Sequence, residues 1–94
     1  DTFKATAYCR TDIGGEYTST GTRTRVGAIA VDPRVIPYGT RMFIMTKDGS
    51  YIYGVATAED CGGAIKGKRL DLFYETDPEC RRFGRRDCDV YFLG

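Results

Sequence analysis

Two aspartates in the stretch from Ala58 to Phe73, AEDCGGAIKGKRLDLF, have the residue types and spacing that suit acid–base chemistry. Asp60 precedes Cys61 and two glycines, so its carboxylate stands before a turn in which backbone N–H groups can approach a ligand closely. Asp71 lies between two leucines. In a strand, burial of both leucines directs Asp71 to the opposite face.

A carboxyl group surrounded by apolar residues loses hydration, which raises its pKa and lets it hold a proton near neutral pH. Asp71 therefore meets the requirement for a general acid. The alternative is structural: Asp60 caps a turn, and Asp71 pairs with Arg69 or Lys68. Perturbed carboxylates serve both purposes in proteins, so these residues alone leave both interpretations open.

The composition limits the possible partners. The chain has 94 residues, enough for one compact core and too few for two. Its 14 basic and 13 acidic residues give a net charge of +1, so nucleic acid is not expected as a partner. No segment approaches the apolar length of a membrane span.

Histidine is absent from the chain. This excludes a Ser or Cys nucleophile activated by an imidazole, and it excludes hydrolysis by a His-ligated zinc ion. The remaining chemistry depends on carboxylates, hydroxyls, tyrosine, lysine and backbone dipoles, and no metal or cofactor is expected.

Four cysteines in so short a chain predict two disulfides and a secreted, extracytoplasmic location. We favour Cys80 with Cys88 and Cys9 with Cys61, although four cysteines allow three pairings. A zinc site is the competing interpretation, and the absence of any Cys-x-x-Cys pair argues against it.

Alternation of apolar and polar residues predicts an all-β chain of about six strands with one short helix. Asp77 is the expected N-cap of the helix, with Pro78 at its first position and Gly84 at its end. A closed barrel would remove the edge strands of so small a sheet. The predicted strands cover residues 3–9, 25–31, 41–46, 51–58, 65–73 and 89–93.

Two polar segments have more than one interpretation. The loop from Arg10 to Thr24 is either functional or mobile. Its hydroxyl-bearing residues 17–20 would suit a sugar-binding rim, but ordinary loop composition explains them equally well. The basic cluster around the helix is either a solvated face or a surface for an anionic polymer. This cluster comprises Arg81, Arg82, Arg85 and Arg86.

Three segments, each containing one aspartate, occur in a fixed order: VDPRVIPYGT from Val31 to Thr40, AEDCGGAIKG from Ala58 to Gly67, and RLDLF from Arg69 to Phe73. Together they resemble the 3D domain, a family named for three aspartates. The similarity extends over most of the chain, from Tyr8 and Thr20 to the final VYFL.

The resemblance implies a single domain over residues 1–94 with a small double-psi β-barrel fold. Members such as the stationary-phase survival proteins and the barrel of membrane-bound lytic transglycosylase A act on peptidoglycan glycan strands, sometimes beside other modules. They cleave the β-1,4 bond between N-acetylmuramic acid and N-acetylglucosamine and form a 1,6-anhydro product. By the motifs, Asp71 is the acid and base, and Asp60 and Asp32 take supporting positions.

The residues fit such a reaction. If the C6 hydroxyl of the sugar attacks C1, one carboxylic acid can protonate the leaving oxygen and then accept the hydroxyl proton. A second carboxylate, at Asp60, would raise the pKa of this acid further. The expected substrate contacts are the backbone N–H groups of Gly62 and Gly63 and the ammonium group of Lys66. Tyr8 and Thr20, which lie at positions that match the family pattern, are also expected to contact substrate.

Cys61 departs from the small hydroxyl residue usual after the second aspartate, which puts substrate contacts in doubt more than the acid. The alternative function is a non-catalytic polysaccharide-binding module, because related barrels such as expansins bind glycans with little or no hydrolysis. A third possibility is a purely structural part of an envelope or phage assembly.

Overall fold

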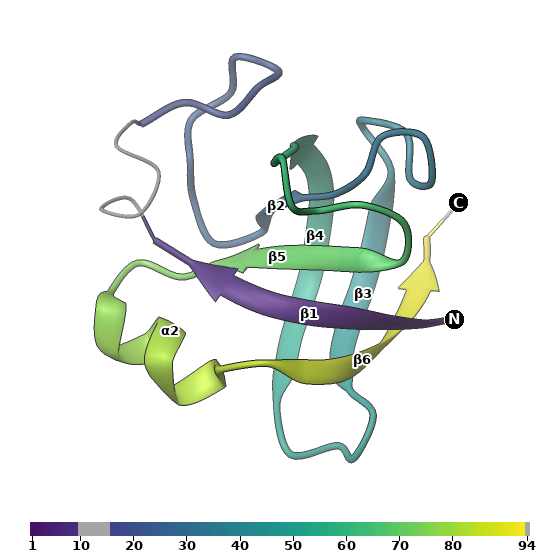
Figure 1. Ribbon diagram of the computed structural model, residues 1–94, viewed down its shortest axis with the longest axis vertical. Helices are drawn as coiled ribbons and strands as arrows, with labels where there is room; N and C mark the ends of the chain where they lie inside the picture. The colour runs from purple at the N-terminus through teal and green to yellow at the C-terminus, as the bar shows by residue number, and fades with distance from the viewer. Residues whose placement is uncertain (10–15, 94) are drawn as a thin grey trace.

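The chain folds into a closed β-barrel. The computed structural model describes residues 1–9 and 16–93, and the strands hydrogen-bond in the order β1-β5-β2-β4-β3-β6 (Figure 1). This confirms the predicted all-β barrel with one short helix. The elements are β1 Thr2–Tyr8, β2 Ala28–Ala30, β3 Arg41–Thr46, β4 Ile52–Asp60, β5 Arg69–Phe73, α2 Asp77–Phe83 and β6 Arg86–Phe92.

The pairing of the strands is mixed. β1 pairs in parallel with β5, and β2 in parallel with β4, whereas the remaining neighbours are antiparallel. Parallel partners cannot be joined by a tight hairpin. Loops between the strands carry some of the predicted site residues, whereas Tyr8, Asp60 and Asp71 lie on the strands themselves. The site residues in the loops are Thr20, Asp32, Gly62, Gly63 and Lys66.

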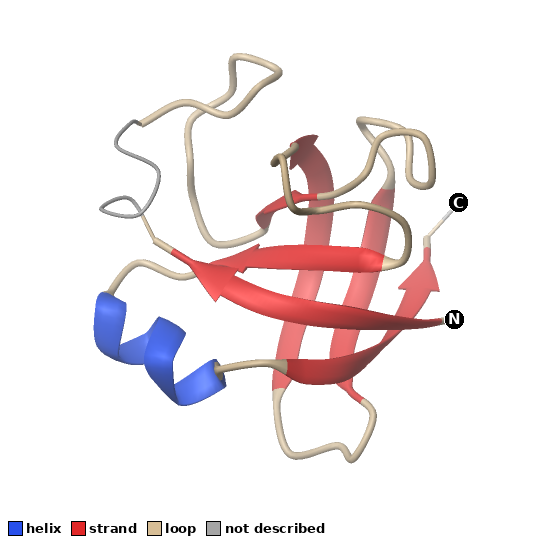
Figure 2. Cartoon of the chain, in the orientation of Figure 1, coloured by secondary structure: helices blue, strands red, loops and turns tan. Residues whose placement is uncertain are grey.

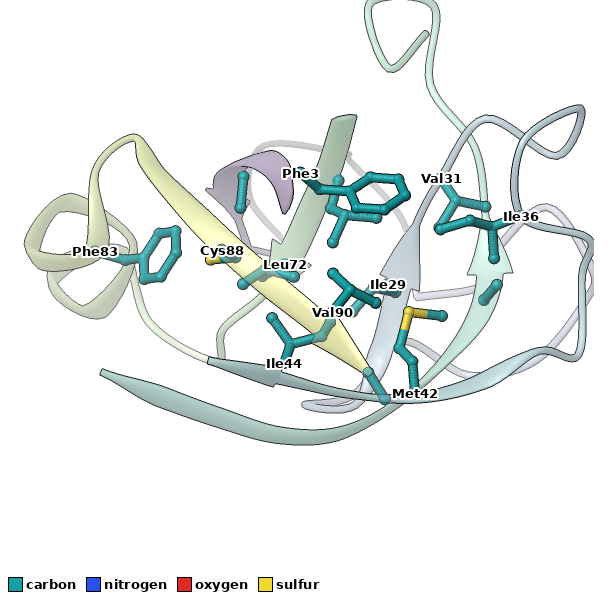
Figure 3. Close-up of a cluster of buried hydrophobic side chains, with 14 residues drawn as sticks. Phe3, Ile29, Val31, Ile36, Met42, Ile44, Leu72, Phe83, Cys88 and Val90 are labelled. Atoms are coloured by element: carbon teal, nitrogen blue, oxygen red, sulfur yellow. The ribbon is translucent and has the colours of Figure 1, made fainter. Parts of the chain in front are cut away.

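The barrel interior is filled by the apolar members of each alternating strand (Figure 3). In β1, Phe3 and Ala5 point inward while Lys4 and Thr6 point outward, as the sequence predicts. The core consists of Phe3, Ala5, Ile29, Val31, Ile36, Met42, Ile44, Ala56, Ala58, Leu70, Leu72, Phe83, Cys88 and Val90.

Helix α2 packs at one end of the barrel (Figure 2). Its N-cap is Thr76, not Asp77 as predicted, and Thr76 forms a capping box with Glu79. Asp77 instead forms an ion pair with Arg81, one turn along the helix, with 2.9 Å between Asp77 Oδ2 and Arg81 Nε. The helix ends at Gly84, as predicted. No helix in the described part of the chain is long and apolar enough to cross a membrane.

Four strands have boundaries that differ clearly from the prediction. β2 is shorter because Gly27, with φ of 104°, ends a turn in which the Ala28 N–H donates to the Arg25 carbonyl. β4 runs through Asp60, which was expected to lie in a turn, and β5 begins only at Arg69. β6 begins at Arg86, where the strand pairs with Ala5 of β1.

Three loops gather at one end of the barrel, opposite the β3–β4 hairpin (Figure 1). They cover residues 16–25, 31–40 and 61–68. Hydrogen bonds join them: Ser19 donates to Asp60, and the Gly67 N–H donates to Asp32. The predicted Arg10–Thr24 loop lies partly outside the described residues, and its later part is the 16–25 loop.

Candidate active site

Asp60 and Asp71 flank the same residue of the barrel wall. Ala30 of β2 pairs with Asp60 of β4 on one side and with Asp71 of β5 on the other. Neighbouring strands lie about 4.8 Å apart, so the two aspartate Cα atoms are separated by about 10 Å. Laterally paired residues share a face, and both carboxylates therefore belong to the outer face of the barrel.

A β-bulge places Asp60 on that outer face. Ala56 and Ala58 of β4 point into the core, and simple alternation would send Asp60 inward as well. The register shifts between Ile29 and Ala30, so Glu59 and Asp60 together oppose one residue of β2. Such a bulge re-aims the following side chain. It places on the same face as Asp71 a carboxylate that would otherwise be buried in the core.

Asp71 is held by the first strand. Its side chain is half-buried, and the Thr6 hydroxyl donates to its Oδ1 at 2.9 Å. Thr6 and Asp71 are register partners across β1 and β5, so the hydrogen bond fixes the carboxylate along the sheet. Beneath it lies a second apolar cluster made of Tyr8, Ala30, Ile65 and Phe73. A carboxyl group in this position is ordered and only partly hydrated.

Asp60 organises the loops around the site. Its Oδ1 accepts hydrogen bonds from the Ser19 N–H at 2.9 Å, the Ser19 hydroxyl at 2.6 Å and the Cys61 N–H at 2.9 Å. Ser19 is 41 residues away in sequence. The carboxylate therefore ties the 16–25 loop to the start of the 61–68 loop.

Tyr8 lies beneath the two carboxylates and is only 4% exposed. Its hydroxyl donates to the Ala28 carbonyl at 3.3 Å. Burial, and then the nearby charges of Asp60 and Asp71, raise the pKa of Tyr8 well above its usual range. Tyr8 was predicted to contact substrate, and in the structure it is a buried member of the cluster with Ala30, Ile65 and Phe73.

Asp32 anchors the 61–68 loop. Its carboxylate accepts hydrogen bonds from the guanidinium and the backbone N–H of Arg34. It also accepts one from the Gly67 N–H at 2.9 Å. The hydrogen bonds from Arg34 and Gly67 hold the pKa of Asp32 far below its usual range. Asp32 is thus ionised at neutral pH and cannot donate a proton.

The predicted ligand-contacting residues of the 61–68 loop lie beside this anchor. Gly63 and Lys66 are exposed and Gly62 is half-buried. Among the described residues, neither the Gly62 N–H nor the Gly63 N–H donates a hydrogen bond within the chain. Both donors are available to a ligand. Thr20, in contrast, uses its hydroxyl on the Glu59 carbonyl at 2.9 Å and fastens the 16–25 loop to β4.

The sequence analysis missed three features of the site. Nothing in the local sequence pairs Thr6 with Asp71, since 65 residues separate them. The same holds for the two-point contact between the Arg25 guanidinium and the buried Glu59 carboxylate, at 2.9 and 2.6 Å. The third is Tyr38, whose hydroxyl interacts with Cys61 and Ser19; its place in the VIPYGT motif was the available signal.

Neither predicted disulfide is formed in the structure. Cys9, Cys80 and Cys88 are buried thiols and Cys61 is an exposed one. Cys61 lies 3.3 Å from the Ser19 hydroxyl, and this contact together with Tyr38 lowers the pKa of its thiol. Across residues 1–9 and 16–93, the structure brings together no group of acidic and thiol side chains that could hold a metal ion.

The basic cluster has a structural role at Arg86. The Arg86 guanidinium donates to the Phe83 carbonyl at 2.7 Å and lies 4.2 Å from the centre of the Tyr51 ring. Arg81 pairs with Asp77 on the exposed helix surface. Arg86 is therefore engaged with the protein, whereas Arg81, Arg82 and Arg85 are exposed.

Comparison with known sequences gives one family. Residues 27–94 match the sequence profile of the 3D domain. The cell wall-binding protein YocH of Bacillus subtilis (strain 168) is 38% identical over 97 residues, covering 98% of this chain and 32% of that protein. The putative cell wall shaping protein YabE of the same organism is 34% identical over 97 residues, covering 98% of this chain and 22% of that protein. The chain thus spans a third or less of these relatives.

Comparison with solved structures gives the same barrel. The crystal structure of MltA from E. coli superposes with a TM-score of 0.70 and 24% identity, over 83% of this chain and 27% of that chain. LtgG of Burkholderia pseudomallei, a lytic transglycosylase, superposes with a TM-score of 0.67 and 29% identity, over 83% of this chain and 26% of that chain.

Proposed function

This chain belongs to the 3D domain family, and from that premise we propose that its single domain, residues 1–94, is a peptidoglycan lytic transglycosylase. Its substrate is the glycan strand, cleaved at the β-1,4 bond between N-acetylmuramic acid and N-acetylglucosamine. The domain acts outside the cytoplasm, as part of a longer wall protein. The names of YocH and YabE, both linked to the cell wall, support this setting.

Asp71 performs both proton transfers in this proposal. The protonated carboxyl gives its proton to the glycosidic oxygen as the bond from C1 to that oxygen breaks. The C6 hydroxyl of the same muramic acid residue attacks C1, and the Asp71 carboxylate takes the hydroxyl proton. The proton lost in the first step is regained in the second, so one carboxyl group suffices and water is not consumed.

The surrounding residues support this single acid. Asp60 lies across Ala30 from Asp71, and a negative charge there disfavours a second one on Asp71. The N–H groups of Gly62 and Gly63 and the Lys66 ammonium can orient an acetamido group or stabilise negative charge. The permanently ionised Asp32 keeps the loop that carries them in place.

One observation supports the proposal: a half-buried carboxylate on the outer barrel wall, held by Thr6, lies across Ala30 from a second carboxylate that binds two loops. The test is digestion of purified peptidoglycan, followed by mass spectrometry of the released muropeptides. Wild-type protein should release ends lighter by one water, and Asp71→Asn should not. Hydrolysed ends, or anhydro ends that persist in the variant, would contradict the assignment.

A binding module without catalysis is the second candidate, and the name of the cell wall-binding relative favours it. Such a module would pellet with insoluble peptidoglycan and leave the glycan intact. The same preparation separates the two candidates, because pelleting and muropeptide release are measured side by side.

A further inference from the structure

Tyr38 is an exposed aromatic residue on a rigid part of the 31–40 loop. Its side chain is 41% exposed. On one side, Ile36 is buried in the core, and on the other the Gly39 N–H donates to the Ala58 carbonyl of β4 at 2.8 Å. The backbone on both sides of Tyr38 is therefore held by the barrel. Its anchor in β4, Ala58, is two residues before Asp60 in the sequence.

The Tyr38 hydroxyl lies close to two polar side chains of the site. These are the Cys61 thiol and the Ser19 hydroxyl, and the interaction with Cys61 is the main cause that raises the pKa of Tyr38. The backbone beside Tyr38 is held by the barrel, and a large part of the ring faces solvent. An ordered aromatic side chain loses little conformational entropy when a ligand packs against it.

The ring belongs to the same cluster as the candidate acid–base residues. Both partners of its hydroxyl, Ser19 and Cys61, donate backbone hydrogen bonds to Asp60 Oδ1. The Gly62 and Gly63 donors follow Cys61 directly. A ligand that reaches these N–H groups therefore also reaches the ring.

We propose that Tyr38 is a stacking residue for one pyranose ring of the glycan strand, at a subsite beside Asp60. This rests on the substrate class of the proposed function and is independent of catalysis. A pyranose ring presents C–H groups on its faces and hydroxyls at its edge, so it can pack on an aromatic ring while its edge meets polar groups. The exposed ring and the N–H donors of Gly62 and Gly63 provide both kinds of contact.

The test separates glycan binding from cleavage. In the Asp71→Asn background, affinity is measured by calorimetry with a soluble tetramer of N-acetylglucosamine and by pelleting with insoluble peptidoglycan. Tyr38→Ala should weaken both by about tenfold or more, corresponding to about 1.4 kcal/mol. Tyr38→Phe keeps the ring and should stay within about threefold of the parent, a difference of less than 1 kcal/mol. The loss should not depend on salt, because stacking involves no net charge.

Tyr91→Ala is the matched control, since Tyr91 is 52% exposed on β6 and its ring lies beside Phe43 of β3. It should bind as tightly as the parent. Tyr38→Leu is measured beside Tyr38→Ala, with thermal unfolding to establish that both variants are folded. Loss of binding in Tyr38→Ala combined with full binding in Tyr38→Phe supports the subsite.

Equal binding by the parent and Tyr38→Ala would overturn the proposal, and so would a parent that binds neither glycan. These outcomes differ from a failure of the proposed function. If wild-type protein releases no anhydro ends but Tyr38→Ala loses glycan affinity, the transglycosylase is rejected and the subsite stands. If wild-type protein cleaves and Tyr38→Ala binds normally, the transglycosylase stands and the subsite is rejected.

Discussion

Two threonine–aspartate pairs lie along β1, and they differ in what surrounds them. Thr6 donates to Asp71 of β5 at 2.9 Å, and Thr2 donates to Asp89 of β6 at 3.2 Å. Both aspartates are half-buried and point to the outer face of the barrel. The local chemistry of the two pairs is the same, so any difference in function must come from their neighbours.

The neighbours of the two pairs have opposite character. Next to Asp89 in the sheet is Met45, which pairs with the 66%-exposed Ile52, so this row belongs to an open outer surface. Asp71 instead adjoins Ala30, across which lies the second carboxylate, and it shares its face of the sheet with the apolar residues Tyr8 and Phe73. A Thr–Asp pair becomes a candidate acid–base group only where long-range contacts enclose it.

The largest expected effect tests this contrast directly. Asp71→Asn should lower the rate of anhydro-muropeptide release by about 10²–10⁴-fold, because it removes the group that transfers both protons. Asp89→Asn should leave the rate unchanged. Muropeptide mass spectrometry at several times measures both. Equal losses in the two variants would show that the environment of Asp71 does not distinguish it.

The next prediction concerns the hydrogen bond between Ser19 of the 16–25 loop and Asp60. Ser19→Ala removes the 2.6 Å hydrogen bond to a carboxylate that is only 9% exposed. Such a bond contributes roughly 1.5–3 kcal/mol, so the unfolding temperature should fall by several degrees. Ser50→Ala is the control, because the Ser50 hydroxyl makes a similar 2.7 Å bond to Asp48 in an exposed turn. A larger loss in the Ser50 variant would contradict the argument.

A smaller effect is expected from the two threonines. Thr6→Val keeps the shape of the side chain and removes the donor to Asp71, so the cleavage rate should fall by about tenfold, which corresponds to about 1.4 kcal/mol. Thr2→Val, the equivalent change at Asp89, should cleave at the wild-type rate. Initial rates on the same peptidoglycan preparation compare them. An unchanged rate in Thr6→Val would remove Thr6 from the positioning of Asp71.

The smallest effect is a pH dependence at Asp32. Its folded pKa lies below the unfolded value of about 3.9, so its stabilising contribution is present above that value and is lost as the pH falls. Wild type should therefore be more stable than Asp32→Asn at pH 6, and the gap should shrink below about pH 4. Thermal unfolding from pH 6 to pH 2.5 measures the gap. A gap that stays constant would mean that the charge on Asp32 contributes nothing.

Much of the fold could be predicted from local sequence. Alternation from Phe3 to Cys9 predicted a strand and the inward positions of Phe3 and Ala5, since successive side chains of a strand point to opposite faces. Arg41 to Thr46 was also predicted as a strand, but as one apolar on both faces, and only the structure shows which alternate residues are buried. Gly84 marked the end of the helix. The N-cap was predicted wrongly because both Thr76 and Asp77 are residue types that cap helices. The capping box between Thr76 and Glu79 makes Thr76 the N-cap.

The cysteines show a different limit. Four thiols in 94 residues predict disulfides on composition, but bond formation depends on side-chain position. In the structure, Cys61 faces Ser19 and Tyr38, while Cys9, Cys80 and Cys88 are buried. Spacing along the chain carries no information about these directions.

The residue types of the site could be recognised in the chain alone: three aspartates in ordered motifs, a glycine turn, and no histidine to offer another chemistry. Their surroundings depend on the folded structure. The bulge at Glu59 and Asp60 places one carboxylate on the same face as Asp71, and contacts over 35 to 65 residues give Asp32, Asp60 and Asp71 different surroundings. A motif lists which groups are available, whereas register and long-range hydrogen bonds set the hydration and the partners of each group, and with them its protonation.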